Sequence, residues 1–122
     1  RRCLVGSEMC IRDSIYFDIR LPKISYSQIN SVLKELDLID YSDIQSVYLS
    51  EGQKRKINIA SFMLSNANLY LLDEPFNNLD SKTTDLVREV FDTKVNSGAK
   101  IIFSSHERFN DDFPLIDMNL FN

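Results

Sequence analysis

The chain has 122 residues, of which 43% are hydrophobic and 26% charged, a balance typical of one globular domain or of part of one. The net charge of −4 at pH 7 leaves no basic stripe of the kind that binds nucleic acid. No apolar run approaches the roughly 20 residues that a membrane-spanning helix needs, so we expect any role at a membrane to go through a partner.

Residues 1–14 differ from the rest of the chain. They contain both cysteines, Cys3 and Cys10, and one of the three glycines, and they show neither helical nor strand periodicity. The pattern of a signal peptide is also missing. The segment resembles adaptor sequence read through at the end of an assembled gene, so we expect a non-native or disordered tail; a native disordered N-terminus is the open alternative. The lack of cysteine after Cys10 fits a cytosolic chain.

The next part of the chain is mainly helical. Residues 15–21 form a short mixed segment that ends at Pro22. Ser25 or Ser27 can cap a helix in which apolar residues recur at helical spacing. These apolar residues are Ile29, Val32, Leu33 and Leu36. Residues 37–47 are predicted to form a loop with a short helical turn.

The clearest helix start in the sequence is at Ser50. Ser50 and Gln53 have the spacing of a capping box, in which each side chain bonds the backbone N–H of the other residue. The apolar stripe of this helix comprises Ile57, Ala60, Met63 and Leu64. The compact apolar run at residues 69–72 is predicted to be a buried strand of a parallel sheet. Residues 73–80 follow as a loop that contains Pro75.

A helix is predicted over residues 81–96, and Gly98 ends it at the position where a left-handed residue is needed. Residues 100–104 form a second core strand. A last strand is indicated by the alternation of Ile116, Met118 and Leu120 with polar or exposed positions. Strands and helices that alternate with short connections are typical of an α/β fold with a parallel sheet.

Two acidic residues follow the first strand directly. Asp73 lies at its carboxyl end, where ligands gather in open α/β sheets and where a carboxylate can hold the Mg²⁺ that bridges nucleotide phosphates. Glu74 comes next, on the emerging loop, where a carboxylate can take part in proton transfer. The alternative is a simple turn that ends the strand, with Pro75 preventing further pairing.

Four further residues are candidates for the functional site. Ser50 and Gly52 stand at a helix N-terminus, where free N–H groups and the helix dipole favour a phosphate, although a plain capping box explains the same residues. Asp80 precedes a helix, and an N-cap is an equally good explanation for it. His106 is the only histidine and follows the second strand; a polar surface residue is the alternative.

In this order and spacing, four pieces of the chain resemble the second half of the ATP-binding-cassette domain of ABC transporters: residues 49–53, residues 69–75, residues 78–80 and His106. The resemblance covers about residue 15 to the C-terminus. It implies a P-loop NTPase-like α/β fold, a parallel sheet with flanking helices. Within residues 15–122, residues 15–65 would belong to the helical signature subdomain and residues 66–122 to the remainder of the catalytic core.

The resemblance implies ATP and Mg²⁺ as cofactors and a role for each candidate near the strand ends. Asp73 matches the family's metal-binding carboxylate. Glu74 matches the general base, a role worth about 10²–10⁴-fold in rate. His106 matches the switch histidine that contacts the γ-phosphate.

The remaining matches lie in the family's composite, two-subunit site. Ser50, Gly52 and Gln53 match the signature that closes over ATP held by a partner subunit, so that two subunits enclose two nucleotides. Asp80 matches the loop along the dimer seam. Glu51 departs from the glycine that is commonest in the family, and a carboxylate there is tolerable only if it points away from the phosphates.

Two family motifs are missing. The glycines are Gly6, Gly52 and Gly98, so the Gly-x-x-x-x-Gly-Lys-Ser/Thr loop that cradles phosphates does not occur. Gln28 and Gln45 lack the context of the family's glutamine loop. We therefore expect a domain truncated at the N-terminus, which by itself neither binds ATP well nor hydrolyses it.

Within the family, the chain resembles the small ATPases of the haem exporter for cytochrome c maturation. Phe76 after Pro75, the basic run at residues 54–56 and the chain end soon after His106 carry this likeness, although the basic run is explained equally well as a solvated helix face. The resemblance implies a homodimer or paired ATPase subunits, transmembrane permease subunits, and a peripheral position on the cytoplasmic side of the inner membrane.

Two alternatives remain. Other small-molecule exporters share these features. Cassette ATPases of DNA repair or chromosome organisation also carry the signature, but they usually have long coiled coils, and the sequence has no sustained heptads. We therefore expect no nucleic-acid partner.

Overall fold

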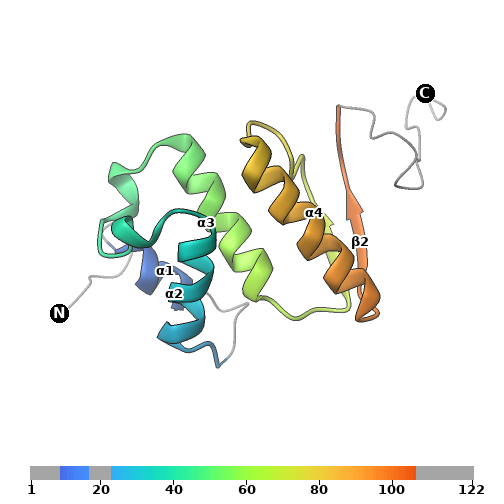
Figure 1. Ribbon diagram of the computed structural model, residues 1–122, viewed down its shortest axis with the longest axis horizontal. Coiled ribbons are helices and arrows are strands. Elements are labelled where there is room, and N and C mark those ends of the chain that lie inside the picture. The colour runs from blue at the N-terminus through green and yellow to red at the C-terminus, as the bar shows by residue number, and fades with distance from the viewer. Residues whose placement is uncertain (1–8, 17–22, 107–122) are drawn as a thin grey trace.

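The computed structural model describes residues 9–16 and 23–106. In chain order the elements are α1 (Ile11–Tyr16), α2 (Tyr26–Glu35), the short 3-10 helices η1 (Ile39–Tyr41) and η2 (Ser46–Tyr48), α3 (Glu51–Leu64), β1 (Leu69–Leu72), α4 (Ser81–Asn96) and β2 (Lys100–Phe103). Figure 1 shows α1, α2 and α3 gathered on one side and α4 with the strands on the other. The segment between α1 and residue 23 and the expected last strand lie outside the described residues.

The two strands pair in parallel and are joined by α4. Leu69 lies opposite Lys100 and Leu72 opposite Phe103, and the bond from Ser104 N to Leu72 O, 3.0 Å long, extends the ladder by one step. A parallel pair needs a crossover connection, which a helix usually supplies. The predicted α/β alternation of strand, helix and strand is therefore confirmed.

Local sequence signals begin and end the helices as predicted. Ser25 and Ser50 each form a complete capping box with the glutamine three residues on. Asp80 caps α4 by accepting a hydrogen bond from the backbone N–H of Thr83 at 2.8 Å. Gly98 ends α4 with a φ of 99°, a conformation that residues with a Cβ rarely adopt.

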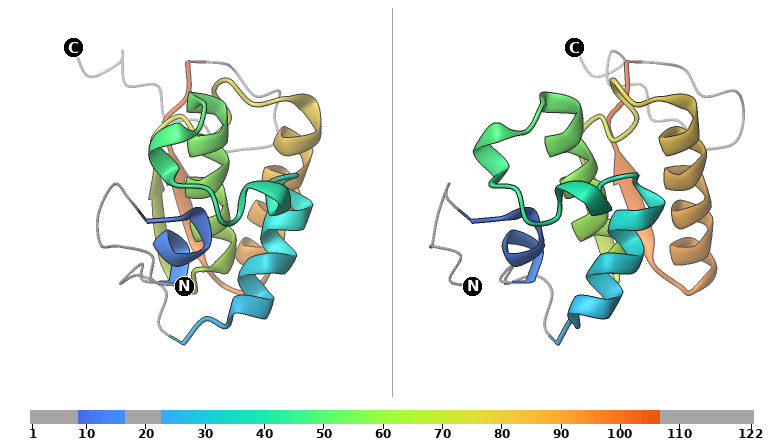
Figure 2. Two further views of the ribbon diagram at one scale, coloured as in Figure 1. Left: turned by 90° about the vertical axis from the view of Figure 1, so that its left-hand side faces the viewer. Right: turned by 60° about the vertical axis from the view of Figure 1, so that its left-hand side comes forward.

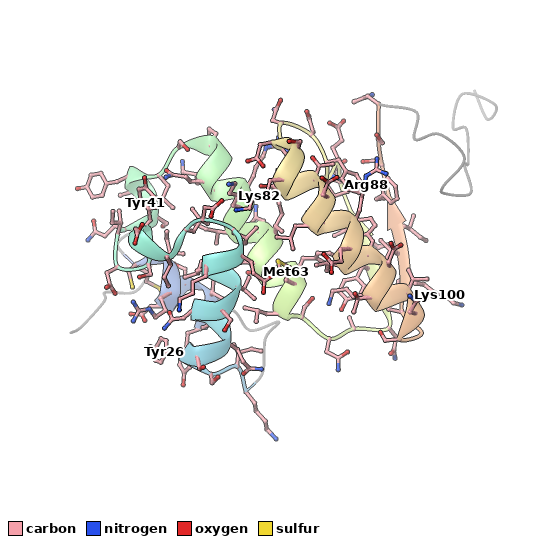
Figure 3. All side chains as sticks on the ribbon, viewed as in Figure 1. Tyr26, Tyr41, Met63, Lys82, Arg88 and Lys100 are labelled. Atoms are coloured by element: carbon pink, nitrogen blue, oxygen red, sulfur yellow. The ribbon has the colours of Figure 1, made fainter. Side chains whose placement is uncertain are left out.

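The apolar core connects the helical layer to the sheet. Its members with at most 2% exposure are Ile11, Ile15, Ile29, Leu33, Leu36, Leu38, Ala60, Val87 and Phe91. Phe91 of α4 lies at the junction, with its ring centroid 5.5 Å from that of Phe62 on α3 and 5.5 Å from that of Phe103 on β2. Lys82, labelled in Figure 3, lies in the first turn of α4. Its Nζ pairs with Asp37 Oδ2, just after α2, at 2.6 Å and so links α4 to the helical layer.

The structure differs from the expected boundary at residue 14. Helix α1 runs through it, and its residue Ile11 is fully buried. The preceding Cys10 is 3% exposed and forms an antiparallel bridge with Gln45. Residues 10–14 therefore pack in the helical layer, because Ile11 and Ile15 share one helical face. A six-residue helix has too few turns for this pattern to show in the sequence.

The strands are not buried on both faces, as the apolar run at residues 69–72 had led us to expect. Tyr70, Leu72 and Phe103 face α3 and α4, and Tyr70 is only 8% exposed. On the opposite face Leu71 is 71% and Ile102 59% exposed. The reason is that α3 and α4 both pack on the same face of the two-stranded sheet (Figure 2).

Candidate functional site

The candidate residues gather at one end of the molecule. The carboxyl ends of β1 and β2 and the N-terminal ends of α3 and α4 point the same way (Figures 1 and 2). Strand carboxyl ends and helix N-termini are the two places where an α/β fold collects anionic ligands. The topology therefore brings all the candidates within one region.

Asp73, Glu74 and His106, which are up to 33 positions apart in the sequence, meet at the strand ends. His106 Nε2 lies 2.6 Å from Glu74 Oε1, within hydrogen-bonding distance. Asn77 Nδ2 donates to the other Glu74 oxygen at 2.8 Å. The Glu74 side chain is 26% exposed and that of His106 is 90% exposed. The two carboxylate oxygens of Glu74 are thus each held by one side chain, His106 and Asn77, and the His106 ring remains accessible to solvent.

The Asp73 carboxylate is held by the neighbouring strand. Ser104 Oγ donates to Asp73 Oδ1 at 2.6 Å and accepts the Glu74 backbone N–H at 3.0 Å. Ser104 follows β2 at the position opposite Asp73, one step beyond the pair formed by Leu72 and Phe103. Sequence reasoning did not select Ser104, although aligning the two strands in parallel would have placed it next to Asp73.

The loop after Asp73 contains a left-handed residue. Glu74 has a φ of 44°, which costs a residue with a Cβ roughly 1–2 kcal/mol. The turn is closed by a bond from Asn77 N to Glu74 O at 3.1 Å. Strained backbone persists only where its surroundings hold it, and such residues cluster at functional sites.

The start of α3 combines a cap with open space. Ser50 Oγ accepts the N–H of Gln53 at 3.2 Å, and Gln53 Oε1 accepts the N–H of Ser50 at 2.9 Å. A Cβ added to Gly52 would meet only Ser50 Oγ, at 3.9 Å, an ordinary contact. Nothing in the described residues therefore requires glycine at this position.

Glu51 is directed along the helix surface. Its side chain is 88% exposed, and its carboxylate pairs with Lys54 Nζ at 2.8 Å. The hydrogen bond from Lys54, followed by its charge, lowers the pKa of Glu51. The carboxylate is thus ionised at neutral pH and directed to a cation on its own helix.

The basic run at residues 54–56 is not simply a solvated face. Arg55 Nη1 donates to Asn77 O at 3.1 Å, and Lys56 Nζ lies 3.4 Å from Asp80 Oδ2. Both contacts join α3 to the loop that leads from Glu74 to α4. Sequence reasoning selected neither Arg55 nor Asn77, because their contact spans 22 positions.

Asp80 combines its cap with this ion pair. The backbone N–H of Thr83 lowers the pKa of Asp80 most, followed by the Thr83 side chain and by Lys56. The N-cap explanation is therefore confirmed as a structural role. It leaves the expected place of Asp80 on a dimer seam untested.

The single carboxylate of Asp73 at the end of β1 suits Mg²⁺ that is bound together with phosphates. The described residues hold no group of three or more His, Cys, Asp or Glu side chains that could bind a metal alone. Mg²⁺ usually takes only one or two carboxylates and completes its shell with phosphate oxygens and water. Asp73 has one oxygen bonded to Ser104 and can offer the other.

The family model described as ABC transporter matches residues 5–77, more than half of the chain. The chain belongs to this family. The match begins before residue 14 and ends just beyond the acidic pair at the end of β1.

Similar proteins agree with this assignment. The chain is 32% identical over 103 residues to the ABC transporter ATP-binding protein YhaQ of Bacillus subtilis, covering 81% of this chain and 35% of YhaQ. It is 40% identical over 76 residues to the cytochrome c biogenesis ATP-binding export protein CcmA of Wolbachia pipientis, covering 61% of this chain and 37% of CcmA. The chain thus spans little more than a third of the length of these two relatives.

A solved structure of the ATP-binding subunit of an ABC transporter has the same fold. The TM-score is 0.73 with 23% identity, over 84% of this chain and 45% of the other. The expected P-loop NTPase-like α/β architecture is therefore confirmed. In residues 9–16 and 23–106, no helix is long and apolar enough to cross a bilayer.

Proposed function

We propose that this chain is part of an ATP-hydrolysing subunit that drives an ABC transporter. The observation that carries the proposal is the meeting of Asp73, Glu74 and His106 at the strand ends, with 2.6 Å between His106 Nε2 and Glu74 Oε1. Asp73 holds Mg²⁺, which supplies charge neutralisation at the phosphates when bound. Glu74 accepts the proton of the attacking water. His106 holds the Glu74 carboxylate and, being 90% exposed, remains open to the γ-phosphate.

The start of α3 serves the ATP of a second subunit. Ser50, Gly52 and Gln53 present a helix N-terminus at the same end of the molecule as the acidic pair. The open space at Gly52 supports this role, because it leaves room for a phosphate group to approach the helix N-terminus. Asp80 lies on the seam between the two subunits. The assembly is a homodimer or paired ATPase subunits bound to transmembrane permease subunits at the cytoplasmic face of the inner membrane.

The 122-residue chain lacks a Gly-x-x-x-x-Gly-Lys-Ser/Thr stretch, the loop that makes most of the contacts to a nucleotide's phosphates in this class of fold. We therefore expect the polypeptide by itself to give no heat of binding with Mg-ATP in isothermal titration calorimetry. Micromolar affinity would contradict this expectation. The tests of catalysis below use the complete protein.

The transported substrate proposed is haem, exported for cytochrome c maturation. The support is the match to several proteins named cytochrome c biogenesis ATP-binding export proteins, at 26–40% identity. The match to YhaQ keeps another small-molecule exporter as the alternative. Deleting the gene for the complete protein distinguishes the two, because c-type cytochromes should disappear from a haem-stained gel only in the first case.

The change Glu74→Gln tests the catalytic proposal in the complete protein. It removes the basic oxygen but keeps the shape and one hydrogen-bonding oxygen. We expect Mg²⁺-dependent ATP hydrolysis to fall by about 10²–10⁴-fold while ATP binding and dimerisation persist. Glu89→Gln, on the exposed side of α4, is the matched control and should leave turnover unchanged. Unchanged turnover in Glu74→Gln would refute the role.

A further inference from the structure

We propose that Ser104 is a positioning residue, whose hydroxyl orients the Asp73 carboxylate and holds the backbone of Glu74 for ATP hydrolysis. This inference rests on the proposed function. Ser104 belongs to none of the motifs that identify the family in the sequence. It is assigned from its two hydrogen bonds, both to residues about thirty positions earlier in the chain.

The single hydroxyl proton of Ser104 is directed to Asp73. The distance of 2.6 Å from Ser104 Oγ to Asp73 Oδ1 is that of a charge-assisted hydrogen bond. The same oxygen accepts the backbone N–H of Glu74 at 3.0 Å. The hydroxyl therefore acts as donor and acceptor at once, and its rotation is fixed by two successive residues.

The backbone of Ser104 is itself held in place. Its N–H donates to Leu72 O at 3.0 Å, which continues the parallel ladder beyond the last pair of β1 and β2. The Cα of Ser104 is therefore set by the sheet. The hydroxyl transmits that fixed position to the Asp73 carboxylate.

For Asp73 the consequence is orientation. Oδ1 is bound by Ser104, so the plane of the carboxylate is defined and Oδ2 is the oxygen left for a metal. Outer-shell partners of this kind fix metal-binding carboxylates, and removing them typically costs about 10–100-fold in metal affinity or activity. Ser104 is such a partner for Asp73.

For Glu74 the consequence is support of a left-handed residue. Its φ of 44° turns its N–H toward β2, where Ser104 Oγ accepts it. Without that acceptor the turn loses a bond that offsets the cost of the conformation. The Glu74 carboxylate, which contacts His106 and Asn77, then moves with its backbone.

The test compares Ser104→Ala with Ser104→Thr in the complete protein. Alanine removes the hydroxyl, whereas threonine keeps it and suits a strand end. Ser97→Ala is the matched control. It also removes a serine hydroxyl that donates a hydrogen bond, to Lys94 O, but it does so at the C-terminal end of α4, away from the candidate site. The measurements are kcat, the KM for ATP and the Mg²⁺ concentration for half-maximal hydrolysis. Amide hydrogen exchange at Glu74, without nucleotide or metal, gives a readout independent of activity.

We expect Ser104→Ala to lower kcat or raise the half-maximal Mg²⁺ concentration by about 10–100-fold. The amide hydrogen of Glu74 should also exchange faster, because it loses its hydrogen bond to Ser104 Oγ. Ser104→Thr should restore both within a few-fold. Ser97→Ala should match the wild type in every measurement. A merely structural role would lower the melting temperature but would leave the Mg²⁺ dependence unchanged.

Wild-type Mg²⁺ dependence and kcat in Ser104→Ala would overturn the inference, as would equal losses in the alanine and threonine variants. If the alanine variant does not fold, Ser104→Cys, whose thiol is a poor donor, must show the same loss. Turnover that persists in Glu74→Gln refutes the proposed function itself. Loss in Glu74→Gln with full activity in Ser104→Ala refutes only the role of Ser104.

Discussion

Replacing Asp80 separates two contributions that one side chain makes to the start of α4. Its Oδ1 accepts the N–H of Thr83 at 2.8 Å, and its Oδ2 lies 3.4 Å from Lys56 Nζ. Asp80→Ala removes both interactions. Asp80→Asn keeps an acceptor for the cap but removes the charge.

The geometry predicts unequal losses. Removing an N-cap acceptor costs about 0.5–2 kcal/mol in the free energy of unfolding. The ion pair adds about 0.2–1 kcal/mol, because the Asp80 side chain is 54% exposed and solvent screens its charge. We therefore expect a loss of about 1.5 kcal/mol for Asp80→Ala and about 0.5 kcal/mol for Asp80→Asn.

The charge contribution also has a predictable pH dependence. The folded structure lowers the pKa of Asp80, chiefly through the Thr83 N–H, from its ordinary value of 3.8. A carboxyl with a lowered pKa stabilises the folded state fully above its unfolded pKa and loses that contribution as the pH falls through the folded pKa. The difference between wild type and Asp80→Asn should therefore be present at pH 7 and vanish in the acid range below the folded pKa.

Urea unfolding of the complete protein, followed by circular dichroism, measures these differences as shifts of the midpoint at constant slope. The Lys56→Met variant completes a double-mutant cycle and isolates the ion pair. Equal losses in Asp80→Ala and Asp80→Asn at pH 7 would refute the cap argument. A difference between wild type and Asp80→Asn that does not change with pH would refute the charge argument.

Two further changes test the packing behind the site. Phe91 is 2% exposed and contacts three other phenylalanine rings, so Phe91→Ala should lower the free energy of unfolding in urea by about 3–5 kcal/mol. The control Tyr48→Ala, at a side chain that is 77% exposed, should lower it by less than about 0.5 kcal/mol. A similar loss in both variants would contradict the role of Phe91 in the core. Lys94→Met removes the donor to Ser65 O, 2.7 Å away at the end of α3, and should cost about 1–3 kcal/mol. Exposed Lys34→Met serves as its control; no loss in Lys94→Met would show that water replaces the ammonium group.

Much of the local structure was predictable because its causes lie within a few residues. The caps at Ser25, Ser50 and Asp80 depend on a partner three positions away. The limits of α4 and the position of β1 agree with those predicted from periodicity and Gly98. The two outcomes that sequence reasoning did not anticipate, the packing of Ile11 and the exposure of Leu71, depend on which elements surround them.

For the proposed site, the sequence by itself predicted the candidates Asp73, Glu74 and His106 and placed each of them after a strand. Only the tertiary structure decided their contacts: the 2.6 Å between His106 and Glu74 and the two bonds of Ser104. The physical reason is that hydrogen bonds act over about 3 Å. The parallel register of β1 and β2 brings residues some thirty positions apart within that distance. Helix α4 connects the two strands along the chain and packs on one face of their sheet.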